Sequence, residues 1–391
     1  VRSLPSLSEL AEGKVKVADL RDVSINDLLG RHSVIANYDL LSLNIENKVV
    51  MVTGAGGSIG SELCRQIFSL KPSKLILFEM SEIALYSIEK ELTSLDSQIK
   101  VYPFLGSVNN KRRLSHILKK FSVQTVYHAA AYKHVPMVEF NNSEGVNNNI
   151  FGTLSSAEAA IDAKVETFVL ISTDKAVRPT NTMGASKRFA EMILQGLSLG
   201  RSSTKFSIVR FGNVLGSSGS VVPLFRRQII NGGPLTVTDP KMIRYFMTIP
   251  EAVELVIQAG SMGTKGDVFV LDMGEPVQIL DLAKKMIYLS GLEIKDDSNP
   301  NGDIEIIFTG LRPGEKLYEE LLIEGNTSKT ENPMIMRAEE GTLTWEELKD
   351  ILCDLEKAIT NSRPDVIREL LVKAIPEFKP QSDITDMLYT K

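Results

Sequence analysis

The sequence predicts an α/β fold built on a doubly wound parallel sheet, and two observations support this prediction. Short runs rich in Val, Ile and Leu recur through the first half of the chain, and segments with helical periodicity separate them. Strands joined by right-handed helical crossovers place helices on both faces of a parallel sheet. After about residue 215, shorter elements separated by glycine-rich turns predict a smaller α/β lobe.

The predicted elements follow one another in a regular order. Helices are expected at residues 58–70 and 81–95. Two amphipathic segments near the C-terminus, "TWEELKDILCDLEKAI" and "DVIRELLVKAI", predict helices that form packing or oligomer surfaces. The strand candidates are "NKVVMV", "SKLILFE", "QIKVYPF", "QTVYHAAA", "ETFVLIS" and "KFSIVRFGN".

These changes of pattern divide the chain into four regions. Residues 1–45 lack a long periodic element and are expected to be a leader or linker. Residues 46–215 form the large lobe and residues 216–335 the smaller one, with some exchange of elements between them, and residues 336–391 form a helical tail. The chain begins with valine, so we expect that an N-terminal part has been removed.

Composition narrows the class of protein. Of the 391 residues, 43% are hydrophobic and 24% are charged, which is typical of a soluble globular chain. The net charge of -5 offers no basic surface for nucleic acid. Cys64 and Cys353 fit no metal-binding or redox spacing, so we expect reduced, structural thiols and no metal site. No apolar run approaches the roughly 18 residues that span a bilayer.

A glycine-rich turn, "TGAGGSIGSEL", joins the first predicted strand to the first helix. Glycines in that setting allow a tight turn and the close approach of a pyrophosphate, which the helix N-terminus stabilises. The turn therefore predicts a Rossmann-like dinucleotide site. The expected contacts are Thr53, Gly54, Gly57, Ser58, Ile59 and Gly60.

Later strand ends extend this predicted site. Glu79 ends the second strand, where a carboxylate would bind the adenosine ribose hydroxyls and disfavour a 2′-phosphate, so NAD is favoured over NADP. A solvated strand end is the alternative interpretation of Glu79 alone. The third strand ends in "FLGSV", and "HAAAYKHVP" follows the fourth, where small residues would let the chain pass under a dinucleotide. The expected contacts are Gly106, Ser107, Val108, Ala129, Ala130 and Ala131.

The chemistry is predicted at the end of the fifth strand, within "STDKAVRPTNTMGASKR". Thr173, Asp174 and Lys175 bring a hydroxyl, a carboxyl and an amine to the carboxyl end of a strand, where α/β folds place catalytic groups. A turn with solvated charges is the alternative. Lys187 resembles the lysine of a Tyr-x-x-x-Lys pair and would bond the nicotinamide ribose, whereas Met183 stands where the tyrosine would be.

These segments together resemble the extended short-chain dehydrogenase/reductase superfamily, and within it the nucleotide-sugar 4,6-dehydratases of bacterial polysaccharide and glycan synthesis. The leader resembles the segment before the catalytic domain of the large, membrane-anchored members. The resemblance therefore implies a homo-oligomeric, cytoplasmic catalytic domain from a protein anchored in the bacterial inner membrane. The matching pieces are "VTGAGGSIGSEL", "HAAAYKHVP", "NNIFGT", "STDKAV", "MGASKR", "RFGNVLGSSGSVVP" and "GLRPGEKLYEELL".

The resemblance implies a redox-neutral dehydration of UDP-N-acetylglucosamine to a UDP-4-keto-6-deoxy sugar, with tightly bound NAD that is recycled. Oxidation at C4 acidifies the C5 proton, a base removes that proton, and an acid protonates the departing C6 hydroxyl. We assign Asp174 as the acid, Lys175 as the base and Thr173 as the partner of the C4 hydroxyl. Lys175 would then need a pKa well below ~10.4, which burial and nearby positive charge would supply.

The same resemblance assigns residues to the ligands and marks two departures. Asn149 is assigned to the cofactor, and Ser107 replaces an acidic residue that normally bonds the adenine. Met183 resembles the large membrane-anchored subgroup, which implies that the C5 configuration is retained. A structural role is the alternative for His134. The assigned substrate contacts are Lys133, His134, Asn213, Val221, Arg244, Arg312 and Glu315.

Two other functions stay open at this point. A UDP-sugar 4-epimerase would share the C4 oxidation, but it would need no acid and base at C5 and C6 and would be expected to keep the tyrosine. A catalytically inactive NAD-binding regulatory protein would also tolerate Met183, although the Asp174–Lys175 pair argues against it.

Overall fold

The computed structural model describes residues 36–95, 98–200, 203–320 and 327–389. These fall into two compact units, a large one from residues 34–212, 249–273 and 312–391 and a small one from 213–248 and 274–311. This division differs from the predicted boundaries at 215 and 335. The reason is that the chain returns to the large sheet after it has begun the small unit.

The large unit is built on a nine-stranded sheet with the order β15-β16-β11-β6-β5-β4-β1-β2-β3. The pairings from β3 to β11 are parallel, whereas β16 runs antiparallel to both β11 and β15. The fold and the six predicted strands are confirmed. The strands are β1 (Val49–Thr53), β2 (Lys74–Glu79), β3 (Lys100–Leu105), β4 (Thr125–His128), β5 (Thr167–Ile171), β6 (Lys205–Arg210), β11 (Asp267–Leu271), β15 (Thr327–Lys329) and β16 (Ile335–Ala338).

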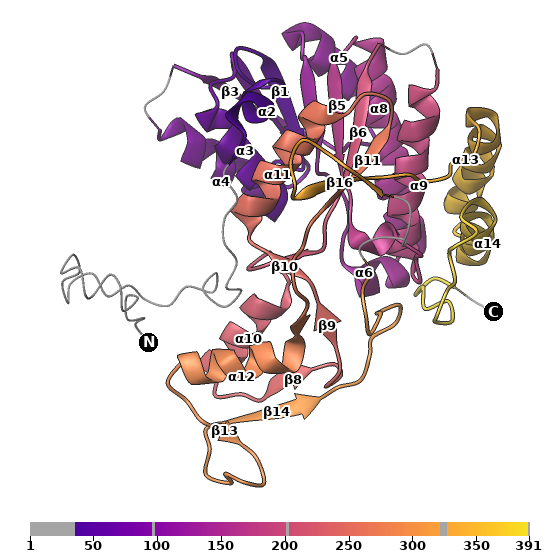
Figure 1. The fold of residues 1–391 in the computed structure, drawn as a ribbon. Helices are drawn as coiled ribbons and strands as arrows, with labels where there is room; N and C mark the ends of the chain where they lie inside the picture. Colours follow the sequence, from indigo (N-terminus) through magenta and orange to yellow (C-terminus); the bar gives the residue numbers. More distant parts are fainter. Residues whose placement is uncertain (1–35, 96–97, 201–202, 321–326, 390–391) are drawn as a thin grey trace. The chain divides into compact units, whose positions relative to one another are not determined.

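Helices cover both faces of this sheet (Figure 1). One layer contains α3 (Ser58–Ser69), α4 (Glu82–Thr93) and α11 (Ile249–Met262). The other contains α5 (Lys111–Phe121), α8 (Gly152–Asp162) and α9 (Thr182–Ser198). Because a layer lies on each side, central strands such as β1 are buried along their whole length, which explains their unbroken apolar sequence.

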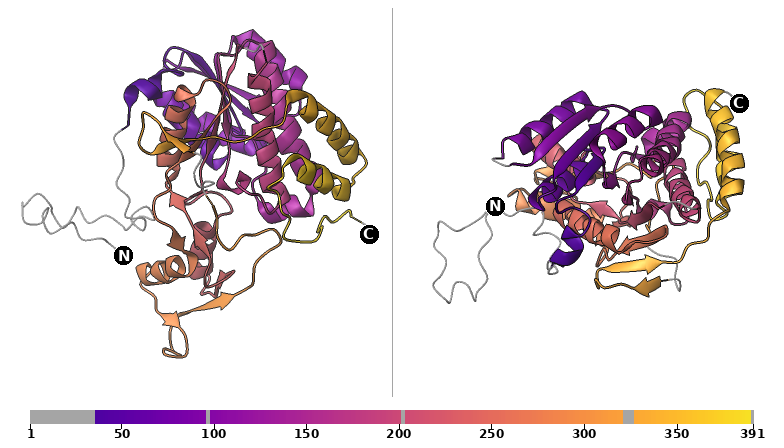
Figure 2. Two further views of the ribbon diagram at one scale, coloured as in Figure 1. Left: turned by 45° about the vertical axis from the view of Figure 1, so that its right-hand side comes forward. Right: turned by 90° about the horizontal axis from the view of Figure 1, so that it is seen from above.

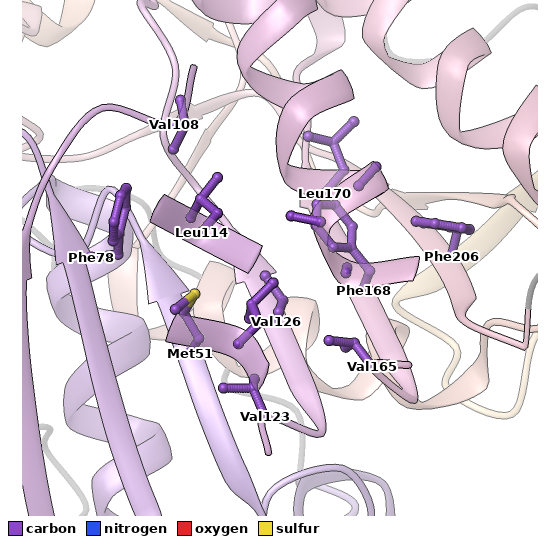
Figure 3. Close-up of a cluster of buried hydrophobic side chains, with 14 of the residues drawn as sticks. Met51, Phe78, Val108, Leu114, Val123, Val126, Val165, Phe168, Leu170 and Phe206 are labelled. Atoms are coloured by element: carbon purple, nitrogen blue, oxygen red, sulfur yellow. The ribbon is translucent and has the colours of Figure 1, made fainter. Parts of the chain in front are cut away.

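The main core lies between the sheet and the layer of α5 and α8. Met51, Phe78, Val126, Phe168 and Phe206 point into it from successive strands, as Figure 3 shows. Phe168 stacks at a tilt against Phe206, with 5.6 Å between the ring centroids. The strands that carry the predicted site therefore rest on a packed apolar layer.

The C-terminal helices are part of the large unit. The predicted helices are present as α13 (Trp345–Thr360) and α14 (Pro364–Ala374), and Figure 2 shows them outside α9. Leu348, Leu355 and Ile367 pack with Phe189 of α9 in one buried cluster. This cover explains why α9 is buried on nearly every side, although an outer helix of a two-layered sheet normally has an exposed face.

The leader predicted at residues 1–45 ends too late, because its last residues belong to the large unit. Helix α2 (Tyr38–Ser42) packs against α11, and Leu40, Leu41 and Ile45 are buried. Asn44 Nδ2 donates to the Gly260 carbonyl over 3.3 Å, so this segment is tied to the large unit. The rest of the predicted leader, residues 1–35, lies outside the described residues. Among the helices that the structure does describe, none combines the length and apolar character needed to cross a membrane.

In its described residues, 213–248 and 274–311, the small unit consists of two helices and three short sheets. A three-stranded parallel sheet has the order β13-β14-β8, a parallel pair joins β10 to β7, and an antiparallel pair joins β12 to β9. Its elements are β7 (Asn213–Val214), α10 (Val221–Ile230), β8 (Leu235–Val237), β9 (Ile243–Arg244), β10 (Phe246–Met247), β12 (Val277–Gln278), α12 (Ile279–Leu289), β13 (Ile294–Lys295) and β14 (Ile304–Phe308).

The packing of α14 predicts a difference between two substitutions on that helix. Ile367 is fully buried, whereas Val372 is 41% exposed. Ile367→Ala should lower the free energy of unfolding by about 2–5 kcal/mol because it leaves a cavity, and Val372→Ala should cost less than about 1 kcal/mol. Urea titration of both variants measures this. Equal losses would contradict the packing of α14 described above.

Candidate active site

The glycine-rich turn after β1 has the backbone that its sequence predicts. Gly54 has a φ of +66°, and a Cβ there would lie 2.7 Å from the Ala130 backbone nitrogen. A Cβ on Gly60 would lie 1.9 Å from the Gly54 carbonyl oxygen. A side chain at either position would therefore push the turn away from β4 or from α3. Gly57 is the N-cap residue of α3, so the N-terminus of the helix opens at this turn.

A cavity of about 290 Å³ lies above this turn. It is formed at the carboxyl ends of β1, β2, β3 and β4, which is where open α/β sheets hold their ligands. The turn, the cavity and the start of α3 fit the phosphates and adenosine of a dinucleotide. The lining residues are Gly54, Gly56, Gly57, Phe78, Glu79, Met80, Ser81, Ala84, Gly106, Val108, Ala129, Ala130, Ala131, Tyr132 and Asn148.

Glu79 is fixed at the edge of this cavity. Its Oε2 accepts a hydrogen bond from the Gly56 amide over 3.0 Å, and Oε1 accepts from the amides of Met80 and Ser81 over 2.8 and 3.0 Å. The residue is only 9% exposed, which excludes the alternative of a solvated strand end. The carboxylate thus joins the end of β2 to the glycine-rich turn and faces the cavity.

Two of the predicted cofactor contacts, Thr53 and Asn149, form hydrogen bonds with other parts of the protein. Thr53 is fully buried, with its Oγ1 2.8 Å from His128 Nδ1. Asn149 lies in η3 (Asn147–Phe151), and its Nδ2 donates to the Tyr132 carbonyl and to Ser186 Oγ over 3.0 Å each. It therefore ties the loop after β4 to α9, and its neighbour Asn148 lines the cavity.

The remaining residues predicted at this site lie just outside the cavity lining. Ser58 and Ile59 form the first turn of α3 and are partly buried. Ser107 Oγ accepts a hydrogen bond from the Asn109 amide over 3.2 Å. This contact shapes the turn after β3, so the serine hydroxyl has a local structural role.

Thr173, Asp174 and Lys175 form a compact cluster after β5. Thr173 is the N-cap residue of the short helix η4 (Asp174–Ala176), and its Oγ1 donates to Asp174 Oδ1 over 2.9 Å. Lys175 Nζ lies 3.1 Å from the same Asp174 oxygen and 2.7 Å from Glu319 Oε1. Asp174 is 2% exposed, so the alternative of a turn with solvated charges is wrong.

The surroundings raise the pKa values of both titrating groups in this cluster, Asp174 and Lys175. Burial, followed by the negative charge of Glu319, raises the pKa of Asp174 to about 6. Burial alone would lower the pKa of Lys175, but the carboxylates of Asp174 and Glu319 outweigh it and raise that pKa. The predicted depression of the Lys175 pKa is therefore wrong, because the two carboxylates beside the amine outweigh the effect of burial.

Asp174 also has one oxygen directed at no donor. Within the described part of the chain, its Oδ2 is buried and accepts no hydrogen bond. A buried acceptor of this kind is costly unless a ligand supplies a donor. Asp174 therefore keeps unused acceptor capacity at this oxygen.

Helix α9 begins beside this cluster and carries the lysine of the predicted catalytic segment. The Asn181 side chain caps it by accepting from the Gly184 amide over 2.8 Å. Met183 and Lys187 are 2% and 4% exposed, and Lys187 Nζ donates to the Ile171 carbonyl over 2.8 Å. Burial, which outweighs the charge of Glu191, lowers the pKa of Lys187 to about 8.

A buried ionic network behind the cluster was not predicted. Glu191 on α9 accepts from Arg210 Nε over 2.8 Å and from Ser172 Oγ over 2.6 Å. Arg188 and Glu340 complete the network through ion pairs at 3.2 and 3.3 Å. Arg188 and Glu191 are three residues apart on α9, but Ser172, Arg210 and Glu340 come from other segments of the chain, so no local spacing indicated that they would join the network.

The loop that holds Glu319 is anchored on the catalytic segment. Lys316 Nζ donates to the Arg178 carbonyl over 2.8 Å, and Asn181 Nδ2 donates to the Gly314 carbonyl over 2.9 Å. These contacts bring Glu319 to Lys175. Glu319 was not among the predicted site residues. It stands in "GLRPGEKLYEELL", but nothing in that motif links it to residue 175.

The predicted substrate contacts are divided between the two units. In the large unit, burial lowers the pKa of His134, and the nearby charges of Lys133 and Arg312 lower it further. Arg312 pairs with Glu315 over 3.5 Å and is largely exposed. Burial, followed by the charge of Lys175, lowers the pKa of Lys133.

The other three lie in the small unit. Asn213 Nδ2 donates to the Tyr245 carbonyl over 3.4 Å, and Arg244, which is 8% exposed, donates to the Ile243 carbonyl over 2.8 Å. Val221 is the first residue of α10.

The two cysteines lie outside the predicted site. Cys64 is buried in α3 and Cys353 is exposed on α13, and neither is in a disulfide. Burial raises the pKa of the Cys64 thiol. Across the described ranges, no group of three or more His, Cys, Asp or Glu side chains has the arrangement of a metal site.

Residues 50–340 match a family described as "Polysaccharide biosynthesis protein". The chain belongs to this family. Over 320 residues it is 52% identical to "Capsular polysaccharide biosynthesis protein CapD" of Staphylococcus aureus, a match that covers 82% of this chain and 52% of that protein. The chain thus spans about half the length of this relative. The match also confirms the resemblance to the extended short-chain dehydrogenase/reductases.

Two further similarities extend over most of the length of the protein compared. The chain is 35% identical to a "UDP-glucose 4-epimerase" of Rickettsia rickettsii, over 73% of this chain and 81% of that protein. The X-ray structure of Pen from Bacillus thuringiensis superposes with a TM-score of 0.67 at 33% identity, covering 79% of this chain and 99% of that one.

The lowered pKa of Lys187 predicts how stability depends on pH. Its pKa is about 8 in the folded protein and about 10.4 when unfolded. Below about pH 8 the lysine is protonated in both states, so its contribution is constant. Between these two pKa values the unfolded state binds more protons, so this lysine makes the free energy of unfolding rise with pH, by up to about 1.4 kcal/mol per unit.

Lys187→Met should remove that rise. The difference in the free energy of unfolding between variant and wild type should therefore change in favour of the wild type as pH increases from 8 to 10. Denaturant titrations at several pH values measure the slope, which is unaffected by the constant cost of losing the bond to the Ile171 carbonyl. Parallel curves for the two proteins would contradict the depressed pKa.

Proposed function

We propose that this chain is an NAD-dependent 4,6-dehydratase of UDP-N-acetylglucosamine that retains the configuration at C5. The observation that carries the proposal is the acid–base cluster of Thr173, Asp174 and Lys175 at the end of β5. The family and the likeness to a capsular polysaccharide protein support a role in making a modified sugar for a polysaccharide. The likeness to a UDP-glucose 4-epimerase supports a UDP-sugar as substrate.

The residues around the cavity fit the cofactor. The turn at Gly54 and Gly60 has no room for a Cβ, which suits the close approach of a pyrophosphate. Glu79 presents a carboxylate that would accept from ribose hydroxyls and repel a 2′-phosphate, so NAD is favoured over NADP. Bound NAD would supply the hydride acceptor for oxidation at the sugar C4 and the hydride donor for C6. Lys187 would hold the nicotinamide ribose by hydrogen bonds.

Asp174 handles the proton at two sugar oxygens. With its pKa raised to about 6, it is ionised at neutral pH and can accept the C4 hydroxyl proton through Thr173. It then holds a proton that it can donate to the departing C6 hydroxyl. A carboxyl group with a pKa near neutrality serves both steps, which explains why burial at this position is useful.

Lys175 removes the C5 proton and returns it to the same face, so the configuration at C5 is retained. Its amine must be neutral before this step, whereas its surroundings favour the ammonium form. Met183 is buried at the start of α9 and transfers no proton, so the C4 hydroxyl proton goes to the Thr173–Asp174 pair. The assignment of Lys133, His134, Asn213, Val221, Arg244, Arg312 and Glu315 to the substrate stays a prediction.

A product assay tests the proposed reaction. Incubation with UDP-N-acetylglucosamine should yield a product lighter by one water, and its NMR spectrum should show the C5 configuration of the substrate. A 4-epimerase, the second candidate because of the Rickettsia likeness, would give a product of unchanged mass. A product of unchanged mass, an inverted ring or no reaction would each contradict the proposal.

Substitutions in the cluster test the assignments. Asp174→Asn and Lys175→Ala should each lower kcat by at least about 100-fold, the usual contribution of a general acid or base. Ser69→Ala, on the exposed end of α3, is the control and should leave kcat unchanged. Turnover of Asp174→Asn or Lys175→Ala within a few-fold of the wild type would exclude that residue as acid or base.

A further inference from the structure

Lys175 is held between two carboxylates, and only one of them has a part in the proposed reaction. Its Nζ lies 3.1 Å from Asp174 Oδ1 and 2.7 Å from Glu319 Oε1. The Glu319 side chain is 4% exposed, so this ion pair is shielded from solvent. Lys175 also keeps a partly exposed side chain, at 21%, which leaves the amine accessible from one side.

This arrangement conflicts with a lysine that acts as a base. An ammonium group cannot take a proton, so Lys175 must lose one before it can attack C5–H. The two carboxylates raise the pKa of Lys175 although burial opposes them, so loss of that proton to solvent is unfavourable at neutral pH. Asp174 is committed to the C4 and C6 oxygens and cannot hold the lysine proton during the same steps.

We propose that Glu319 is a positioning residue that accepts the proton of the Lys175 ammonium and holds it while the lysine acts as the base. The proposal rests on the dehydratase function above. One N–H bond at Nζ breaks and one O–H bond at Glu319 Oε1 forms, so the pair keeps its total charge and no electrons are transferred. After Lys175 has returned its proton to C5, Glu319 gives the stored proton back to Nζ.

The loop that carries Glu319 is held in place for this contact. Lys316 Nζ donates to the carbonyls of Val177 and Arg178 over 3.2 and 2.8 Å, and Asn181 Nδ2 donates to the Gly314 carbonyl over 2.9 Å. The loop is therefore fixed on the backbone that follows Lys175. A fixed acceptor at 2.7 Å is within direct proton-transfer distance of the amine.

The other charged groups around the pair come from three segments. Asp174 belongs to the same short helix as Lys175, and Lys133 lies in the loop after β4 close enough for its charge to act on Lys175. Lys316 and Glu320 come from the loop of Glu319, where Glu320 pairs with Arg178 over 3.4 Å. The cations of Lys133 and Lys316 favour the neutral form of Lys175, and the Lys175–Glu319 transfer leaves the net charge of this group unchanged.

An internal transfer predicts a characteristic pH profile. In the wild type, the Lys175–Glu319 pair has the same number of protons before and after the transfer. The plot of kcat/KM against pH should therefore show no rising limb from Lys175 between pH 7 and 9. In Glu319→Gln the proton must leave to solvent. The variant should lose at least about 100-fold in kcat/KM at pH 7 and regain about tenfold per pH unit towards pH 9, as expected for one ionising base.

Matched variants separate proton storage from a structural role. Glu319→Asp keeps an acceptor and should restore the flat profile, even with a lower kcat. Glu320→Gln removes the neighbouring, more exposed carboxylate and should keep the wild-type profile. If Glu319→Gln folds poorly by circular dichroism, Glu319→Ala with added acetate gives the same test, since acetate should flatten its rising limb.

The outcomes distinguish this proposal from the proposed function. A Glu319→Gln profile with the wild-type shape, whatever its height, would overturn proton storage by Glu319 and leave the dehydratase proposal intact. No product from the wild type at any pH would instead refute the dehydratase function and, with it, this inference. A new rising limb in Glu319→Gln that Glu319→Asp abolishes supports the assignment.

Discussion

The buried ion pair between Glu191 and Arg210 holds together the elements on which the catalytic segment depends. It joins α9 to β6, and Glu191 also accepts a hydrogen bond from Ser172, the residue just before the Thr173–Asp174–Lys175 cluster. Both side chains are almost fully buried. Removing one partner of such a pair leaves a buried charge, at a cost of about 3–5 kcal/mol, whereas the intact pair adds little net stability. Its main effect is therefore to fix the position of the chain at the end of β5.

The proposed catalytic cluster depends on this anchoring because its groups are joined by short contacts. Asp174 needs burial to bring its pKa near neutrality, and burial requires that β5, η4 and α9 meet at one place. Lys175 is also buried, and burial by itself would lower its pKa. The two carboxylates beside the amine outweigh burial and raise that pKa. The substitution of methionine for tyrosine at position 183 is consistent with this arrangement, since the acid–base groups come from the segment just before it.

The sequence predicted much of the large unit because its signals are local. Unbroken apolar runs indicated buried parallel strands, and the glycine-rich turn after β1 indicated the backbone found at Gly54 and Gly60. The leader was overextended because α2 is only a single turn long, too short to show a helical period. Thr53 and Asn149 were assigned to a ligand from motif position alone, whereas their hydrogen bonds to His128 and Tyr132 depend on neighbouring strands and helices.

The sequence by itself thus determined the fold class and the family, and it placed Thr173, Asp174 and Lys175 next to one another, since each of these is encoded in residues close together in the chain. Only the tertiary structure decided that Glu319 lies against Lys175, that Glu191 binds Arg210, and that α13 and α14 cover α9. It also decided the direction of the Lys175 pKa. The physical reason is that burial and Coulomb interactions depend on distances in space, and residues far apart in the sequence supply most of the charges and apolar surfaces involved.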